Sequence, residues 1–308
     1  MIYLDYSANT PADERVLARF CAVERRCPGN ANSHHQAGSD AKAEIDHATQ
    51  TIARLLRVKP AEIIYTSGAS ESNNFALKGL ARLSRHVGKH IISTPLEHSS
   101  VSGTLTALQE QGYEIDLVDI KRDGTIDLDH LKELLRPDTI VVAVTMVDSE
   151  LGVVQPVQEI AEILKEYPHC HLHVDATQAV GKIPVSFEGV DTMSLTAHKF
   201  YGLNGIGLLL KRRNLALEPL IHGGESTTIY RSGTPDGGSG LLAGAGTGAG
   251  RGAAAGARRG CPKGQCIPPH RAGQVSQSPH QQPGKRHPPH PEPERAGRQG
   301  HGLPAGAQ

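Results

Sequence analysis

The chain has 308 residues, and its 32 basic and 32 acidic side chains give it no formal net charge. No segment approaches the roughly 20 apolar residues of a membrane helix, and the N-terminus lacks the basic and apolar regions of a signal peptide. Five cysteines show neither a disulfide framework nor paired zinc-type CxxC motifs. We therefore expect a cytoplasmic protein with no membrane contact and no metal site.

Seven short β-branched runs predict strands, and amphipathic stretches between them predict helices. Alternation of this kind, with strands apolar almost throughout, favours an α/β fold with a mainly parallel sheet covered on both faces. Ligands of such sheets bind outside the carboxyl ends of the strands. The expected strands are 62–66, 90–93, 114–118, 139–145, 171–174, 192–195 and 206–210, and the expected helices lie near 38–57, 70–84, 99–111, 128–136 and 156–167.

The composition changes after Pro235. From Asp236 onward there are nine Lys or Arg against three Asp or Glu, half of the 34 glycines, half of the 20 prolines and no aromatic residue. Such a segment has too little apolar surface to offset its ordering entropy. We therefore expect a folded domain over residues 1–235 and a low-complexity tail, disordered or out of frame, over residues 236–308.

Lys199 is the strongest single indication of function. It lies between a predicted strand end and a glycine-rich turn, which suits a lysine that forms a Schiff base. Asp175 directly follows the predicted strand 171–174, about one βα unit upstream, and offers a carboxylate for a pyridinium nitrogen. Pyridoxal 5'-phosphate (PLP) chemistry requires this pair of groups.

The turn 66–74 follows a strand and opens a helix. Gly68 permits a tight turn, and Ala69 and Ser70 offer backbone amides and a hydroxyl at the positive end of the helix, which suits a phosphate. An ordinary N-cap by Ser67 or Ser70 would produce the same pattern. Because the same sequence also offers Lys199 and Asp175, we interpret the turn as a phosphate site.

Other strand ends carry weaker candidates. His98 could stack on a cofactor ring and exchange protons near neutral pH, and Gln178 could donate to a phenolic oxygen; each also suits a plain helix position. Residues 148–152 form either a site loop or a simple turn. The run 231–234 offers a cation, Arg231, and the hydroxyl of Thr234 for an anion.

Taken in chain order, these motifs resemble the NifS/IscS-type cysteine desulfurases of the class V aminotransferase family, which are PLP enzymes of fold type I. The matching motifs are Tyr3-Leu-Asp-Tyr-Ser-Ala, the 66–74 turn, Glu97-His98, 173–178, Ala197-His-Lys199 with Gly202 and Gly205, and 231–234. They extend over residues 1 to 235. The resemblance implies a seven-stranded sheet, a PLP cofactor and a homodimer.

The resemblance also implies a role for each candidate. Lys199 holds PLP and moves protons, Asp175 keeps the pyridine nitrogen protonated, His98 stacks on the ring, and Gln178 contacts the phenolic oxygen. Ser149 stands where the family commonly has an asparagine, so its contact would need a bridging water. The phosphate is expected to contact Ala69, Ser70, Thr196 and His198, and Thr234 of the partner subunit.

The implied reaction takes sulfur from L-cysteine and leaves alanine and a persulfide on an enzyme cysteine, which passes the sulfur to an acceptor protein, either a scaffold or a thiolation enzyme. The cysteine loop and the substrate-binding arginine belong to a C-terminal small domain that is not recognisable here. Cys261 and Cys266 lie in Gly/Pro-rich sequence without the expected surroundings. We therefore expect impaired turnover.

A shift of reading frame explains the break after Pro235, because residues 280–294, translated from the second base of each codon, allow a sequence like the family's strand in this region. A natural disordered extension is the alternative. Alternative functions are a selenocysteine lyase or another class V carbon–sulfur lyase or aminotransferase, and a non-catalytic partner-binding protein of sulfur transfer. Nucleic-acid binding is disfavoured, since the basic tail has no aromatic platform.

Overall fold

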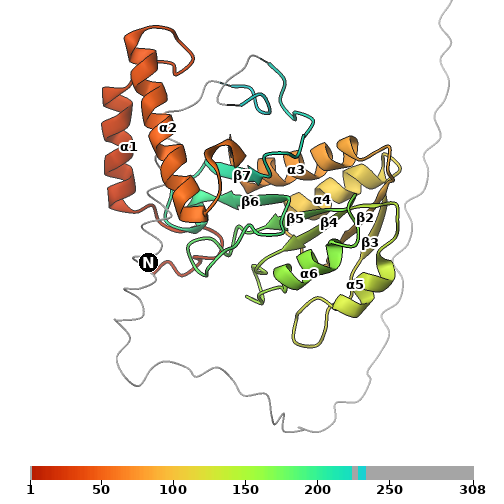
Figure 1. Ribbon diagram of the computed structural model, residues 1–308. Helices are drawn as coiled ribbons and strands as arrows, with labels where there is room; N and C mark the ends of the chain where they lie inside the picture. Colours follow the sequence, from red (N-terminus) through yellow and green to blue (C-terminus); the bar gives the residue numbers. More distant parts are fainter. Residues whose placement is uncertain (1, 224–227, 234–308) are drawn as a thin grey trace, which may run out of the picture. The chain divides into compact units, whose positions relative to one another are not determined.

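The computed structural model describes residues 2–223 and 228–233, and within them a single seven-stranded sheet forms the centre of the fold (Figure 1). Its strand order is β1-β7-β6-β5-β4-β2-β3; β7 runs antiparallel to both neighbours, and the other pairings are parallel. The strands are β1 (Ile63–Thr66), β2 (His90–Ser93), β3 (Glu114–Leu117), β4 (Thr139–Thr145), β5 (His171–Asp175), β6 (Thr192–Thr196) and β7 (Gly207–Lys211).

Helices cover both faces of this sheet. Alternate residues of β4 point to opposite sides, so that Val141 and Ala143 join one hydrophobic cluster and Val142 and Val144 the other. The first cluster lies under α3 and α4, and the second includes the apolar face of α6 (Figure 1). The helices are α1 (Glu14–Arg26), α2 (Gln36–Leu56), α3 (Ala69–Leu83), α4 (Ser99–Gln109), α5 (Leu128–Leu134) and α6 (Val157–Leu164).

The predicted fold class is confirmed, and all seven predicted strands are present within one residue at each end. The prediction omitted α1, which is polar overall and buries only Val16 and Val23. The predicted boundary at residue 235 and the tail beyond it lie outside the described residues.

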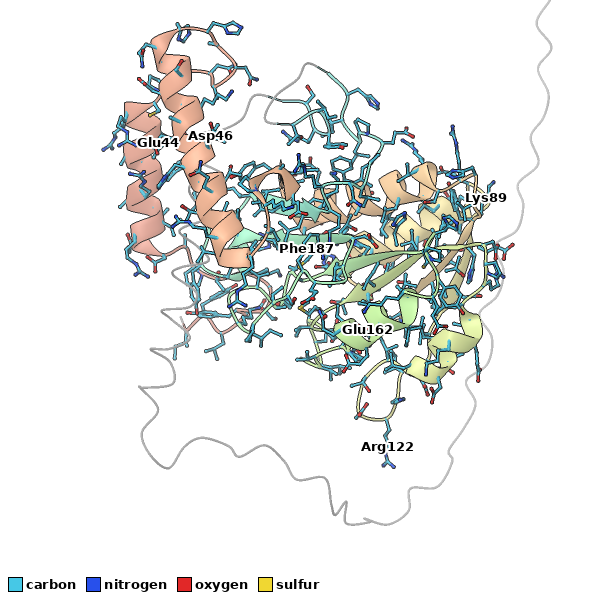
Figure 2. The ribbon with its side chains drawn as sticks, viewed as in Figure 1. Glu44, Asp46, Lys89, Arg122, Glu162 and Phe187 are labelled. Carbon is cyan, nitrogen blue, oxygen red and sulfur yellow. The ribbon has the colours of Figure 1, made fainter. Side chains whose placement is uncertain are left out.

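The α1–α2 pair stands beside the sheet at the end where β7 and β6 lie (Figure 1). Glu44 of α2, labelled in Figure 2, accepts hydrogen bonds from Arg19 at 3.1 Å and from Arg26, which joins the two helices. The C-terminal half of α2 buries Ile52 and Leu56 in the main core. None of the helices in the described residues has the length and apolar character needed to cross a membrane.

Candidate functional site

A cavity of 520 Å³ opens at the carboxyl edge of the sheet, where five parallel strands present the segments that follow them. Nine of the ten predicted site residues line it: Ala69, Ser70, His98, Ser149, Asp175, Gln178, Thr196, His198 and Lys199. The tenth, Thr234, lies outside the described residues. What each of the nine contributes to a cofactor stays a prediction.

Lys199 ends a single 3₁₀ turn, Ala197–Lys199, directly after β6. Its Nζ donates to the backbone carbonyls of Ser7 and Ala8, both at 2.7 Å, so the N-terminal segment forms part of the site. Burial lowers the pKa of Lys199, and the carboxylates of Asp5 and Asp175 oppose this change. A lowered pKa increases the fraction of neutral amine, which is the nucleophilic form.

Asp175 ends β5 with its carboxylate buried and hydrogen-bonded at both oxygens. Its Oδ1 accepts from the backbone amide of Thr177 at 2.9 Å, and its Oδ2 accepts from the side-chain amide of Asn73 at 2.8 Å. A carboxylate held in this way has a fixed direction, which suits an acceptor for one particular ring N–H. The hydroxyl of Thr177, also on the cavity wall, is buried and has no partner among the described residues.

His98 is the N-cap of α4 and is exposed at the cavity. Its Nδ1 accepts from the backbone amide of Ser100 at 3.1 Å and lies 2.8 Å from the Ser100 hydroxyl. Because Nδ1 is an acceptor, the ring hydrogen sits on Nε2. Both interpretations of His98 are therefore compatible with the geometry, since capping α4 leaves the ring beside the cavity.

The first turn of α3 faces the same cavity. The amides that open a helix have no intrahelical acceptor, and they carry the positive end of its dipole. Gly68 precedes the helix as its N-cap and makes no side-chain cap, so the ordinary capping alternative is not what the structure adopts there. Thr196 and His198 lie across from this turn, with the Thr196 hydroxyl 3.1 Å from His198 Nδ1.

Gln178 and Ser149 occupy the remaining walls. The amide nitrogen of Gln178 donates to the Ser7 carbonyl at 2.9 Å, and its oxygen accepts from Lys182. Since an ammonium can only donate, Lys182 fixes which end of the Gln178 amide faces the site. Ser149 is exposed in a turn that Asp148 organises by accepting from the amides of residues 150 and 151.

The structure pairs the guanidinium of Arg231 with a carboxylate, and its role in binding an anion stays a prediction. Its Nε donates to Glu71 at 3.0 Å, and Arg231 is not among the residues that line the cavity. Burial raises the pKa of Glu71, but hydrogen bonds from Ser67 and the charge of Arg231 outweigh it and lower the pKa overall. The cation therefore neutralises a carboxylate beside the first turn of α3.

Glu97 is a half-buried residue whose carboxyl oxygen Oε2 is buried, and sequence reasoning quoted it only as part of a motif. Its Oε1 accepts from the Thr94 hydroxyl and the Thr145 amide, both at 2.8 Å, whereas the buried Oε2 has no partner among the described residues. Burial raises its pKa to about 8, with hydrogen bonds opposing and the charges of Asp175 and Asp148 reinforcing the rise. Glu97 is therefore protonated at neutral pH.

Replacing Glu97 by glutamine should change how stability depends on pH. Between about 4.5 and 8 the folded protein keeps a proton that the unfolded chain has released, so the wild-type free energy of unfolding falls as pH rises. In the wild type this slope is at most about 1.4 kcal/mol per pH unit, and E97Q should remove it. Urea unfolding at several pH values measures it. Glu110→Gln, at the exposed C-cap of α4, controls for loss of a carboxyl; equal slopes for wild type and E97Q would contradict the assignment.

Sequence reasoning missed three features of the site: the carbonyls of Ser7 and Ala8, the amide of Asn73 and the ammonium of Lys182. Backbone carbonyls carry no sequence signal. Asn73 and Lys182 were visible only as ordinary helix and turn residues. Among the described residues, no group of three or more His, Cys, Asp or Glu is placed to hold a metal ion.

Comparison with known proteins identifies a family and several relatives that this chain resembles. Residues 2–250 match the family model described as Aminotransferase class-V. The chain is 41% identical over 235 residues to the cysteine desulfurase IscS of Dictyoglomus turgidum, covering 76% of this chain and 59% of that protein. It is 42% identical over 238 residues to the mitochondrial cysteine desulfurase of Arabidopsis thaliana, covering 76% and 52%. The chain thus spans less than two thirds of the length of these relatives.

Solved structures also resemble this chain in fold. A NifS-like protein superimposes with a TM-score of 0.81 at 35% identity, covering 84% of this chain and 72% of the other. SspA, solved in complex with cysteine, gives a TM-score of 0.77 at 34% identity, covering 80% and 72%.

Proposed function

Because this chain belongs to the class V aminotransferase family, whose members related to cysteine desulfurases are PLP enzymes, we propose that it is the PLP-binding part of a cysteine desulfurase. The single observation that carries the proposal is one cavity that holds the Lys199 amine, the Asp175 carboxylate and the His98 imidazole. The IscS relatives and the cysteine complex of SspA support L-cysteine as substrate.

The residues present fit PLP at three places. The first turn of α3 offers a phosphate backbone amides that have no intrahelical acceptor. The buried Asp175 carboxylate offers an acceptor to a protonated ring nitrogen, and Lys199 offers an amine to an aldehyde. The unpartnered Thr177 hydroxyl on the cavity wall is consistent with a polar ligand there. Bound PLP supplies an electron sink that stabilises negative charge on the substrate α-carbon.

The protein's own groups then have distinct tasks. Asp175 holds a proton at the ring nitrogen, His98 covers one ring face, and Gln178 donates toward the phenolic oxygen. Lys199, with its pKa lowered by burial, removes and returns the proton at the substrate α-carbon. Ser149, exposed on the cavity wall, contacts the cofactor and the substrate. The phosphate is held by Ala69, Ser70, Thr196 and His198.

We propose that the overall reaction converts L-cysteine and an enzyme thiol to L-alanine and an enzyme persulfide, whose outer sulfur passes to an acceptor protein. The reaction would take place in the cytoplasm, in a homodimer to which Thr234 contributes across the interface. Since neither Cys261 nor Cys266 has the sequence surroundings of the family nucleophile, we expect slow turnover by this chain.

The test is to load the purified 308-residue chain with PLP, reduce it with borohydride and map the modified peptide. We expect the label on Lys199. In parallel, alanine and sulfide released from L-cysteine, and products from L-selenocysteine, are measured with and without a thiol reductant. Failure to take up PLP refutes the proposal; rapid, repeated persulfide formation would refute only the expectation of slow turnover.

We also propose that residues 1–235 form the PLP-binding large domain and that residues 236–308 are read out of frame. The family model extends to residue 250, 15 residues past the break in composition. Sequencing the gene around the codon for Pro235 decides the matter, and an uninterrupted frame there would leave a natural extension as the explanation.

A further inference from the structure

Asn73 lies at the centre of a buried hydrogen-bond network next to the site. It is in the second turn of α3, and its side chain is completely buried. Its Nδ2 donates to Asp175 Oδ2 at 2.8 Å and to the Ser100 hydroxyl at 2.9 Å, and its Oδ1 lies 3.1 Å from His173 Nε2. Both amide hydrogens and the amide oxygen of Asn73 therefore have partners.

The carboxylate of Asp175 determines the direction of every bond in this network. A carboxylate oxygen accepts, so the atom of Asn73 that faces Asp175 must be the amide nitrogen. The amide oxygen therefore faces His173, and His173 carries its hydrogen on Nε2. The other ring nitrogen, Nδ1, then accepts from the Thr192 hydroxyl at 2.9 Å.

His173 is fully buried between these two partners. Burial lowers its pKa below the ordinary value for a histidine, and the charge of Asp175 opposes the change. The ring is therefore neutral at physiological pH, which the network requires, because an imidazolium could not accept from Thr192. The network thus has one consistent set of hydrogen positions.

The network also reaches the opposite wall of the cavity. Ser100 accepts from Asn73, so its own hydrogen is free to donate to His98 Nδ1, 2.8 Å away. A continuous path of hydrogen bonds therefore runs from Asp175 through Asn73 and Ser100 to His98. Networks of this kind hold their members in one arrangement when every group is satisfied.

We propose that Asn73 is a positioning residue, which aims the Asp175 carboxylate at the cofactor's ring nitrogen and, through Ser100, sets the orientation of His98. The inference rests on the proposed function, since it assigns Asn73 to the same PLP site. Asn73 acts through Asp175 and does not itself line the cavity.

The test compares Asn73→Ala and Asn73→Leu, which fills the vacated volume if alanine unfolds the protein, with Asn74→Ala as the matched control. Asn74 is the next residue of α3 and donates only to the Ser70 carbonyl, at 3.0 Å, among the bonds of its side chain that the structure shows. Loss of a hydrogen bond to a charged group should weaken PLP binding about tenfold in either Asn73 variant. Asn74→Ala should retain wild-type affinity.

A structural role alone would lower the melting temperature without altering the bound cofactor. We therefore also measure the ¹⁵N chemical shift of the pyridine nitrogen in protein loaded with ¹⁵N-labelled PLP. It should move toward the unprotonated value in the Asn73 variants and stay in place in Asn74→Ala. A folded Asn73 variant with wild-type affinity and wild-type shift overturns the proposal.

The unliganded protein provides an independent check. Long-range ¹H–¹⁵N spectra should show the Nε2–H tautomer of His173 in the wild type and loss of that preference in the Asn73 variants. A wild-type Nδ1–H tautomer overturns the network and the proposal, even if PLP binds. If the wild type takes up no PLP but shows the Nε2–H tautomer, the proposed function fails together with this role, and the network survives as a purely structural one.

Discussion

Lys199→Ala is expected to abolish the borohydride-stable attachment of PLP and to reduce turnover of L-cysteine by at least about a hundredfold. Among the described residues that line the cavity, Lys199 alone carries an amine that can join an aldehyde covalently. Positioned proton transfer by such a group contributes about 10²–10⁴-fold. Mass spectrometry of the reduced protein measures attachment, and alanine formation measures turnover.

Lys199→Arg is the companion variant, because it keeps a cation beside the carbonyls of Ser7 and Ala8 but cannot form the covalent link. It should fold like the wild type and remain unlabelled. Lys182 is the nearby amine to exclude: its pKa is lowered to about 8 by burial and by the charge of Lys199. A label that persists in Lys199→Ala, or that maps to Lys182 in the wild type, would show that the attachment site is wrong.

Gly207→Ala is expected to destabilise the protein by about 2 kcal/mol and to weaken PLP binding. Gly207 opens β7 and pairs with Thr66 of β1 and Thr196 of β6, so it lies between two of the segments that line the cavity. A Cβ at this position would come within 2.5 Å of the Gly68 backbone. Overpacking against backbone typically costs about 1–3 kcal/mol, and here it displaces the turn before α3.

The control is Gly103→Ala, in the middle of α4, where an added Cβ meets nothing within 4 Å. There alanine should stabilise by up to about 1 kcal/mol, because glycine is a poor helix former. Urea unfolding gives the stabilities, and PLP titration gives the affinities. If Gly207→Ala matched Gly103→Ala in both measurements, the close approach of β7 to the Gly68 turn would not matter for the site.

Most of the strands were predictable from sequence because they are short apolar runs buried on both faces, as β4 illustrates with all seven of its residues buried. The edge strand β3 differs, since both of its end residues are exposed. Lys199 and Asp175 were predictable because they stand at strand ends, where parallel sheets place ligands. By contrast, α1 was missed because its sequence is polar overall, with only two residues buried. Asn73 was missed because its importance depends on His173 and Asp175, 100 and 102 residues away.

The contact between the first residues of the chain and Lys199 has a practical consequence for handling the protein. The two carbonyls that accept hydrogen bonds from Lys199 Nζ belong to an exposed stretch, residues 2–8. Ser7 lies 192 positions before the lysine in the sequence. A purification tag fused ahead of Met1, or a truncation that shortens this stretch, would shift or remove the two carbonyls that accept hydrogen bonds from the Lys199 amine. Biochemical samples are therefore best tagged elsewhere, since colour and reactivity measured on an N-terminal fusion would report partly on the tag.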